Sequence, residues 1–385
     1  MYQYRLYPSR VQQDRLYKTF DTCKSVYNEL LELDINTYKS TKNGVSKFGF
    51  NKHLRGKHPE VFSQVLQNIS DRVDKAFKNF YRRVKGGAKK KGFPRFKSCV
   101  RSITYPQAGF KFTSDRRLYC SKIGNIPIVL HRPPKGKMKT LTIKRNHACQ
   151  WYAVFACEVE PQKVKHKGGK VGIDVGLENY ATLSDGTIIA NPRHLIKSEH
   201  RLARLQRNLS RKVKGSNNRK KARFKVAKQH QRVNDQRRDF LHKLTHTLTQ
   251  KYKTINIENL NVAGMVRNHH LAKHIHDASW ARFASMLSYK AVTGGGRVIE
   301  VNPRNTSRTC SNCGTIMDMP LSKRVFDCPV CGLVCHRDLN AANNIGRGGL
   351  PRTYTPADSR PPSPMGTSPL VEAGTTCDSA TPQVK

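Results

Sequence analysis

The stretch Val171-Gly-Ile-Asp-Val-Gly176 places a carboxylic acid, Asp174, inside a run of glycines and apolar residues. The segment 179–186, Asn-Tyr-Ala-Thr-Leu-Ser-Asp-Gly, follows closely and ends in a turn dipeptide. It predicts a second strand that pairs with the first in a hairpin. A carboxylate in an apolar strand costs free energy unless it is paired or binds a cation. We therefore expect Asp174 to belong to a functional site.

Two further acids stand in comparable settings. Glu258 ends the segment Thr-Ile-Asn-Ile-Glu, which predicts a strand, and Asp338 lies in the segment 337–345, which predicts the start of a helix. For either acid alone, a helix cap or a salt bridge would be the better explanation. Together with Asp174 they supply the hard oxygen ligands that two Mg²⁺ ions need in phosphodiester hydrolysis. The order strand Asp, strand Glu, helix Asp suits a RuvC-type ribonuclease-H fold, whereas transposases of the Asp-Asp-Glu class place their Glu last.

Four of the 11 cysteines form two CxxC pairs with the spacing of a metal site. Cys310-Ser-Asn-Cys313-Gly is followed, after 14 residues, by Cys328-Pro-Val-Cys331-Gly. Two such turns supply four thiolates for a tetrahedral Zn²⁺, and the trailing glycines let the backbone turn its N–H groups towards the sulfurs. Four protein ligands leave no open position, so we expect this zinc to be structural and not catalytic. Cys335 is expected to be a spare, structural thiol.

The chain is strongly basic, with 71 Lys and Arg against 26 Asp and Glu in 385 residues and a formal net charge of +45. Such a charge requires a polyanionic partner, and phosphate backbones fit best because each neutralised phosphate releases condensed counterions. An anionic membrane surface is the competing partner, but the sequence shows no amphipathic or lipidated anchor. It also shows no apolar run of membrane length and no signal peptide. We therefore expect a cytoplasmic protein that binds nucleic acid and no membrane.

The spacing of apolar residues changes along the chain. Residues 11–85 show helical spacing, and residues 100–160 show the pattern of short strands with turns. Residues 194–250 predict two long helices joined at residues 215–218. The last residues are rich in Pro, Ser and Thr and have balanced charges, which predicts a disordered tail.

Two basic clusters are the candidate phosphate contacts. The first cluster is Lys89, Lys90, Lys91 and Arg95, and the second is Arg219, Lys220, Lys221 and Arg223. Around the second cluster, from Arg193 to Arg238, Lys and Arg greatly outnumber the two acids Glu199 and Asp235. A charge this one-sided repels itself strongly unless a polyanion lies nearby, which favours contact with nucleic acid. A solvated helical hairpin is the alternative.

Several longer motifs are shared with one known family. In the N-terminal half they are RLYPSRVQQDRL, KSVYNELLE, NISDRVDKAFKNFYRRVK, FPRFKS and SITYPQAGFKF. In the C-terminal half they are GIDVGLENYATLSDG, NDQRRDFLHKLTHTL, IENLNVAGM, DASWARF, NPRNTSRTCSNCG and RDLNAANNI. With these motifs the chain resembles, nearly throughout to about residue 348, the TnpB (OrfB) family of nucleases encoded by insertion sequences and related to type V CRISPR effectors.

The resemblance implies a multidomain α/β fold. The implied parts are a wedge β-barrel (1–10 and 93–165), an inserted helical recognition lobe (11–92), a RuvC-like nuclease (169–303 and 336–348), an inserted zinc ribbon (304–335) and a disordered tail (349–385). It also implies an RNA-guided DNA endonuclease that carries a guide RNA from the transposon end. The guide pairs with double-stranded target DNA, while the protein reads a short adjacent motif. Such a protein would act in the prokaryotic cytoplasm, on the nucleoid, as a monomer or a dimer.

By motif position, the resemblance implies that Asp174, Glu258 and Asp338 form the catalytic, Mg²⁺-binding triad and that the two CxxC pairs hold Zn²⁺. One departure is visible. Many relatives have Asp two residues before the last catalytic acid, where this chain has His336. The triad itself is complete, so we expect the change to affect metal preference or rate and not to abolish activity.

The sequence features disfavour the alternative functions. A weak or inactive RNA-guided DNA-binding protein would be marked by loss of an acid, and none is missing. A transposase acting directly in strand transfer is disfavoured by the order of the acids. A basic RNA-binding protein with a zinc ribbon leaves Asp174 unexplained. His274-Ile-His276, with Tyr289 as nucleophile, matches the signature of single-strand transposases. That chemistry needs both His on a strand, whereas here they are expected in a His-rich loop before a helix.

Overall fold

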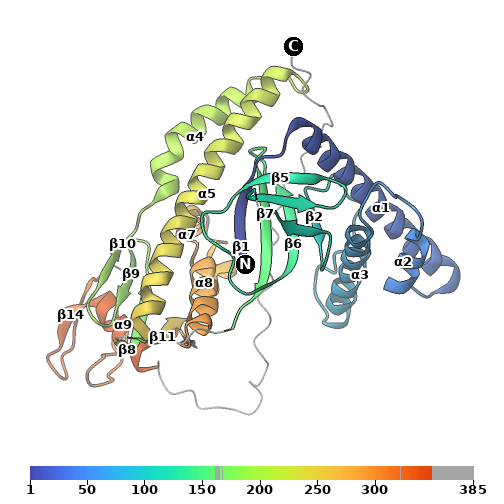
Figure 1. Ribbon diagram of the computed structural model, residues 1–385. Coiled ribbons are helices and arrows are strands. Elements are labelled where there is room, and N and C mark those ends of the chain that lie inside the picture. The colour runs from blue at the N-terminus through green and yellow to red at the C-terminus, as the bar shows by residue number, and fades with distance from the viewer. Residues whose placement is uncertain (114, 161–164, 167, 321, 349–385) are drawn as a thin grey trace. The chain divides into compact units, whose positions relative to one another are not determined.

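The computed structural model describes residues 1–113, 115–160, 165–166, 168–320 and 322–348. They fall into two compact units, one from Met1 to Val159 and one that begins at Glu160, each with its own hydrophobic core (Figure 1). The expected mixed α/β, multidomain character is confirmed at this level. The tail predicted for residues 349–385 lies outside the described residues.

Three helices open the first unit: α1 (Arg10–Thr41), α2 (Lys47–Leu54) and α3 (Ser63–Lys85). Helix α1 begins at a capping box, because the Ser9 hydroxyl accepts a hydrogen bond from the Gln12 backbone and the Gln12 side chain accepts one from the Ser9 backbone. The apolar residues that recur at helical spacing are buried in the core of this unit. The helices predicted for residues 11–85 are thus confirmed.

Seven strands of the described residues form the sheet of the first unit, in the order β2-β6-β7-β1-β5-β4-β3. They are β1 (Tyr2–Leu6), β2 (Ser102–Tyr105), β3 (Phe110–Phe112), β4 (Arg117–Cys120), β5 (Gly124–Val129), β6 (Lys137–Arg145) and β7 (Trp151–Glu158). Neighbouring strands are antiparallel throughout. Tyr17 and Phe20 of α1 both pack against Trp151 of β7 with tilted rings, each with its ring centroid 5.5 Å from that of Trp151. Helices and sheet therefore share one core.

The second unit is built on a five-stranded sheet of the order β10-β9-β8-β11-β12, counted over its described residues. The strands are β8 (Gly168–Val175), β9 (Asn179–Leu183), β10 (Ile188–Ala190), β11 (Tyr252–Glu258) and β12 (Arg297–Val301). Strands β8, β11 and β12 are parallel, whereas β9 and β10 run antiparallel to their neighbours. Asp174 in β8 lies opposite Thr182 in β9, so the predicted hairpin is confirmed.

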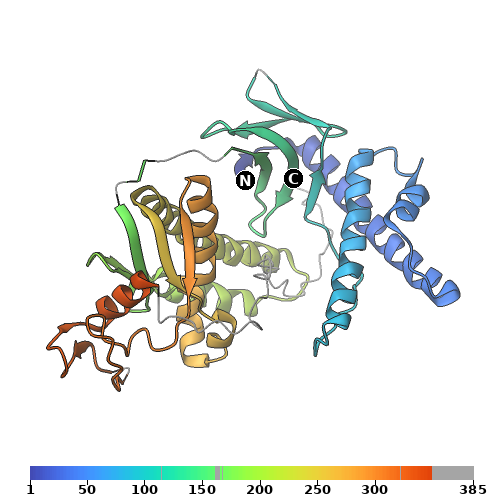
Figure 2. The same ribbon diagram turned by 90° about the horizontal axis from the view of Figure 1, so that it is seen from below.

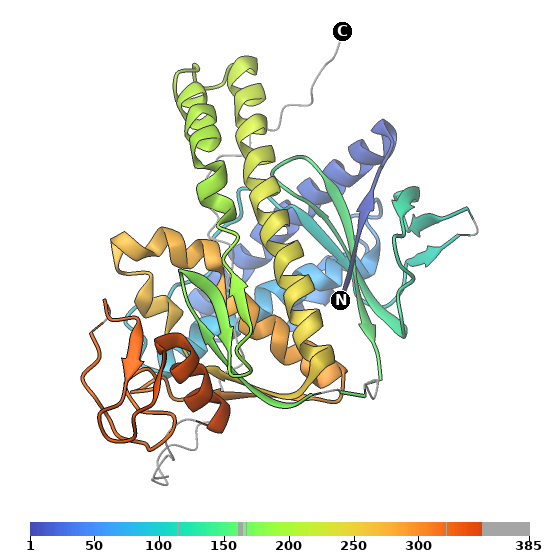
Figure 3. The same ribbon diagram turned by 90° about the vertical axis from the view of Figure 1, so that its left-hand side faces the viewer.

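The described residues of the second unit also form six helices. They are α4 (His194–Ser210), α5 (Asn217–Lys251), α6 (Val262–Met265), α7 (His269–Ala278), α8 (Trp280–Thr293) and α9 (Arg337–Arg347). Helices α4 and α5 form the predicted long hairpin, which extends beyond the sheet (Figure 3). Helices α5 and α8 pack against one another beside the sheet (Figure 2). No helix within the described ranges has both the length and the apolar character needed to cross a membrane.

The two faces of β8 contact different helices, because side chains alternate along a strand. Ile173 is buried in the core shared with α5 and α8. Gly172 faces α9, and a Cβ at this position would lie 2.0 Å from the carbonyl oxygen of Ala342. Only glycine permits so close an approach of helix and strand. By the same alternation, Asp174 faces the side of α9.

A buried acid, Asp277 at the end of α7, fixes the base of the α4–α5 hairpin. Its carboxylate accepts hydrogen bonds from the backbone N–H of Leu195 at 3.0 and 3.1 Å, and from Nε of Arg237 in α5 at 2.7 Å. The Asp277 side chain is only 7% exposed, so this ion pair is shielded from solvent. One acid therefore holds both helices of the hairpin.

Candidate functional site

Asp174 and Glu258 stand at the ends of two neighbouring parallel strands, β8 and β11. The last aligned residues of these strands directly precede the two acids, so the acids occupy adjacent positions at one edge of the sheet. Both face α9. Two residues before Glu258, Asn256 donates a hydrogen bond to the carbonyl of Ile345 in α9 at 2.8 Å. The third predicted acid, Asp338, lies in the first turn of that helix.

The pKa of Asp174 reflects its burial and the charges of the other two acids. Burial, followed by the negative charges of Glu258 and Asp338, raises the pKa of Asp174 well above its usual range. Burial also raises the pKa of Glu258, although a hydrogen bond from Thr306 acts in the opposite direction. Asp174 thus lies within electrostatic range of Glu258 and Asp338, although the three acids are far apart in the sequence.

Among the described residues, these three carboxylates have no Lys or Arg as an ion-pair partner. Within the described residues, Asp174 and Glu258 form no ion pair with Lys or Arg, and Asp338 approaches only His336, with Nδ1 and Oδ2 3.9 Å apart. The positive charge of Arg337 lowers the pKa of Asp174 but does not offset burial and the two neighbouring acids. A divalent cation would relieve the remaining repulsion. The donor set of three carboxylates fits Mg²⁺, which prefers oxygen ligands.

Helix α9 is bonded to the segment that leads into the first CxxC pair. Asn340 accepts a hydrogen bond from the backbone N–H of Ser311 at 2.8 Å and donates one to the carbonyl of Thr309 at 2.7 Å. One turn later, Asn344 donates to the carbonyls of Thr306 and Thr309, at 2.8 and 2.7 Å. The helix that carries Asp338 and the cysteine segment are therefore held in one fixed arrangement.

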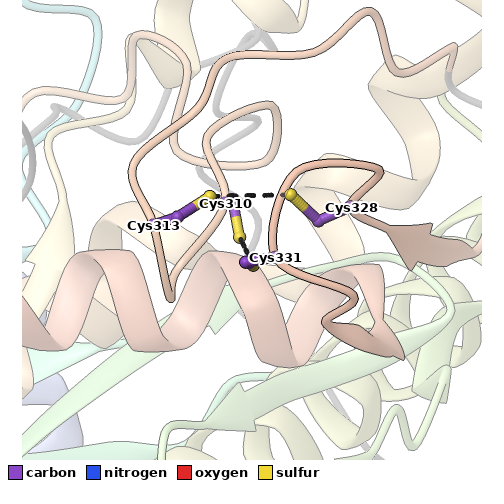
Figure 4. Close-up of side chains that lie close together, drawn as sticks. All are labelled: Cys310, Cys313, Cys328 and Cys331. Atoms are coloured by element: carbon purple, nitrogen blue, oxygen red, sulfur yellow. Dashed lines mark hydrogen bonds between the residues drawn. The ribbon is translucent and has the colours of Figure 1, made fainter.

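The four predicted cysteines converge. The Sγ atoms of Cys310 and Cys331 lie 3.5 Å apart, and those of Cys313 and Cys328 lie 3.6 Å apart (Figure 4). All four Sγ atoms lie within 4.8 Å of one another. Tetrahedral ligands at the usual Zn–S distance would stand roughly 3.8 Å apart. A short hairpin, β13 (Val325–Asp327) and β14 (Val334–His336), joins the module to α9.

Each CxxC turn is closed by the glycine that follows it. Gly314 and Gly332 have φ angles of 83° and 70°, in the left-handed region that favours glycine. Hydrogen bonding with Thr315 lowers the pKa of Cys313 to about 6. A backbone hydrogen bond from Cys331 acts to lower the pKa of Cys328, but burial and side-chain hydrogen bonds to Cys313 and Cys331 raise it to about 11. Cys335 lies beside the cluster but outside the group of four, as expected. The module thus has the donor set and the turns of a Cys₄ zinc site.

The first basic cluster lies on the segment that follows α3. Its members are exposed: Lys89, Lys90, Lys91 and Arg95. Arg83 of α3 donates hydrogen bonds to the carbonyls of Lys91 and Gly92 at 2.6 and 2.7 Å, which folds the segment back onto the helix. Phe93 then packs edge-on against Phe80, yet it remains 50% exposed. The structure presents these charges to solvent next to an aromatic ring.

The second basic cluster lies at the start of α5, and its members differ. Lys221 and Arg223 are exposed. Arg219 instead donates hydrogen bonds to the carbonyls of Leu209 and Lys212, at 3.0 and 2.8 Å, and so closes the turn between α4 and α5. The sequence could not reveal this use of Arg219, because its charge looks the same as that of its neighbours.

The histidine pair does not have the geometry of a single-strand transposase. His274 and His276 lie within α7, so the expectation of a His-rich loop was wrong. The Asn268 side chain caps this helix, and Ile275 is buried on its inner face. Residues two apart on a helix point in different directions, whereas the nuclease chemistry needs both His on one face of a strand. Within the described residues, no strand carries this pair.

Comparison with known proteins places the chain in a family. Three family profiles match: "Probable transposase" of the OrfB type over residues 154–269, "Cas12f1-like, TNB domain" over 280–345, and "Helix-turn-helix domain" over 1–43. A Streptomyces pristinaespiralis protein named "Putative RNA-guided DNA endonuclease" is 35% identical over 364 residues, which cover 91% of this chain and 89% of its own. The chain belongs to the TnpB (OrfB) family. The Escherichia coli member InsQ is 34% identical over 306 residues, or 74% of each chain.

Solved structures share the fold at low sequence identity. One is the cryo-EM structure of a Cas12f1–sgRNA–target DNA complex, with a TM-score of 0.55 and 15% identity over 87% of this chain and 82% of the other. Another is the mini-RNA-guided endonuclease CRISPR-Cas_phi3, with a TM-score of 0.52 and 10% identity over 90% and 91%. This TnpB-family chain therefore shares a fold with compact CRISPR effectors.

Several residues around the acids were not predicted from the sequence. Thr306, Asn340 and Asn344 connect α9, the cysteine segment and Glu258. A signal was present, because Asn340 and Asn344 are four apart in a predicted helix and therefore share a face. Asn256 also alternates with Glu258 in an apolar strand, which marks a buried polar side chain.

Proposed function

We propose that this chain is an RNA-guided DNA endonuclease, encoded by an insertion sequence, in which Asp174, Glu258 and Asp338 form the hydrolytic centre. The observation that carries the proposal is that Asp174 and Glu258 lie in adjacent positions at one sheet edge, with Asp338 of α9 within electrostatic range of Asp174 and no ion pair to Lys or Arg among the described residues. The names of the relatives in Streptomyces and Escherichia coli support the RNA-guided part.

The three acids are the groups that would hold two Mg²⁺ ions. When bound, such ions activate a water molecule and stabilise the leaving oxygen of the phosphodiester. Asp174 and Glu258 are held by neighbouring strands, and Asp338 is held by the first turn of α9. The close fit of α9 against Gly172 keeps the helical acid at a fixed position relative to the strand acids.

We assign the other parts of the chain from its membership of the TnpB family. The sheet of the first unit would be the wedge β-barrel, α1 to α3 the recognition lobe, and the sheet of the second unit a RuvC-like ribonuclease-H domain. The four cysteines would bind one structural Zn²⁺. Guide RNA and target DNA would contact exposed basic residues, which position phosphates and carry no base information. The exposed candidates are Lys89, Lys90, Lys91, Arg95, Lys221 and Arg223, and the half-buried Lys220 lies beside them.

RNA-guided cleavage is tested with the protein purified together with RNA transcribed across the 3′ end of its own gene. Double-stranded DNA that matches the guide is offered beside a library of flanking sequences, with Mg²⁺ or with EDTA. We expect Mg²⁺-dependent cleavage of matched DNA next to one short flanking motif, and a changed guide should redirect the cut. Cleavage that ignores the guide would contradict the proposal, and binding of matched DNA without cleavage would favour an inactive DNA-binding protein.

A further inference from the structure

A single hydroxyl connects the cysteine segment with one of the three acids. Thr306 is only 5% exposed, and its Oγ1 lies 2.5 Å from Oε1 of Glu258. This distance is typical of a hydroxyl that donates to an ionised carboxylate. The carbonyl of Pro303 is a second acceptor at 3.2 Å, but a hydroxyl has one proton to donate. The shorter contact shows that Glu258 receives it.

This hydrogen bond restricts the orientation of the Glu258 carboxylate. The terminal torsion of a glutamate side chain is broad, so an unbonded carboxylate turns easily. A bond at Oε1 fixes the plane of the group, and within the described residues Oε2 has no hydrogen bond or ion pair. The free oxygen is therefore available to a cation in one defined direction.

Thr306 is itself held from two sides. Its carbonyl accepts a hydrogen bond from Asn344 of α9 at 2.8 Å, and the same segment continues to Cys310 of the four-cysteine cluster. The backbone N–H of Ser311, next to Cys310, is bonded to Asn340, which is fully buried. The position of the Thr306 hydroxyl is thus determined by α9 and by the cysteine module together.

We propose that Thr306 is a positioning residue that orients Glu258 for a divalent cation and so couples the cysteine module to the nuclease site. The inference rests on the proposed role of Glu258. Thr306 does not touch the substrate in this proposal. It acts by holding one carboxylate oxygen, so that the other keeps its direction when the cation enters or leaves.

The test compares variants of the full-length chain that differ by one hydroxyl. Thr306→Val keeps the shape of the side chain and removes the donor, and Thr306→Ser keeps the donor. Thr306→Ala is measured alongside, so that a packing defect in one variant does not decide the result. Thr309→Val is the matched control, because Thr309 is equally buried, lies in the same segment, and donates only to the carbonyl of Asn305 at 2.9 Å.

Two quantities are measured: the Mn²⁺ affinity of the protein without nucleic acid, by electron paramagnetic resonance, and the Mg²⁺ dependence of cleavage by the RNA complex. We expect Thr306→Val and Thr306→Ala to weaken Mn²⁺ binding and to raise the half-saturating Mg²⁺ concentration by about 10- to 100-fold, as found for residues that orient metal ligands. Thr306→Ser should restore both to within about threefold of wild type, and Thr309→Val should match wild type equally well. Zinc content should be the same in every variant.

Thr306→Val and Thr306→Ala proteins that match Thr309→Val in both quantities would overturn the inference. An equal loss in Thr306→Ser would overturn it as well, because the hydroxyl would then not be the cause. Glu258→Gln separates this failure from that of the proposed function. If Glu258→Gln still cleaves at the wild-type rate, the nuclease assignment fails. If Glu258→Gln is inactive while Thr306→Val is normal, only the positioning role fails.

Discussion

Asp174 and Glu258 occupy adjacent positions in two parallel strands, each one residue beyond the last pair in the β8–β11 register. The carboxyl ends of parallel strands meet at one edge, where many α/β proteins place their ligands. Helix α9 then contributes Asp338 from a segment that follows the cysteine module. These acids come from three separate parts of the chain, and the negative charges of Glu258 and Asp338 both act on Asp174.

The first prediction concerns the stability cost of this arrangement. Folding raises the pKa of Asp174 above the unfolded value of about 3.9, so the folded state holds its proton more tightly. Stability of the metal-free protein therefore falls as the pH rises from the unfolded pKa to the raised folded pKa. Asp174→Asn removes the charge, so we expect a higher midpoint of thermal unfolding in EDTA at pH 7.5. The gain should disappear below about pH 4.

Asp185 provides a control of opposite sign. Although burial acts in the other direction, hydrogen bonds from Tyr252 and Lys251 hold the pKa of Asp185 well below its usual range. Its contribution to stability is present above the unfolded pKa and is lost as the pH falls through the folded pKa. Asp185→Asn should therefore lower the unfolding midpoint at pH 7.5. A lower midpoint for Asp174→Asn as well would show that Asp174 is held by contacts we have not recognised.

The second prediction concerns zinc. Purified protein should contain one zinc per chain, and Cys328→Ser should lose it and lower both soluble yield and thermal stability. Metal binding at such a site is folding free energy, on the order of 10 kcal/mol in isolated modules. Cys335→Ser is the matched control, since Cys335 lies beside the cluster but outside the group of four. Atomic absorption that finds no zinc in freshly prepared wild-type protein would refute this assignment.

The third prediction concerns the contact of β8 with α9. Gly172→Ala should displace α9, because the new Cβ would meet the carbonyl of Ala342 at 2.0 Å. We expect a loss of about 1–3 kcal/mol or more in the free energy of unfolding. Gly169→Ala, in the same strand, has no heavy atom within 4 Å of its new Cβ and should be nearly neutral. Equal stability of the two variants would mean that α9 does not pack as described.

The fourth prediction concerns the basic hairpin. Charge reversal at the exposed Lys221, Arg223 and Lys225 should weaken nucleic-acid binding without changing which sequence is chosen. Each lost phosphate contact should flatten the slope of log affinity against log salt by roughly one unit. Arg219 is left unchanged because it closes the turn between the helices. The control protein carries the charge-conserving substitutions Lys221→Arg, Arg223→Lys and Lys225→Arg. If the reversed and control proteins have the same slope, this surface does not contact phosphates.

The local pattern of the sequence was sufficient to predict the elements that carry the acids. The strand that contains Asp174, the strand that ends at Glu258, the helix that begins near Asp338 and the long hairpin all follow from apolar spacing, which is a local property. The two CxxC pairs were equally clear, because their spacing is set by the turns that the metal requires.

Contacts between distant residues could not be predicted in this way. The hydrogen bond from Thr306 to Glu258 joins residues whose proximity depends on the whole sheet. Arg219 has the same charge as its neighbours, so the sequence does not show that it closes the turn. The helix α7 was missed because its four histidines suggested a loop. The Asn268 cap and the burial of Ile275 stabilise this helix despite its four histidines. The features that the sequence did not predict are thus tertiary hydrogen bonds and a helix stabilised by burial.

The most direct test of the central claim is a paired measurement of DNA binding and DNA cleavage. Wild type and the variants Asp174→Ala, Glu258→Ala and Asp338→Ala are each loaded with guide RNA and given the same matched double-stranded DNA in Mg²⁺. We expect each variant to bind the DNA with an affinity close to wild type and to produce no detectable cut, because in our proposal each acid would hold the cation and none would be needed for guide pairing. Cleavage by Asp174→Ala at the wild-type rate would contradict the assignment of the nuclease site.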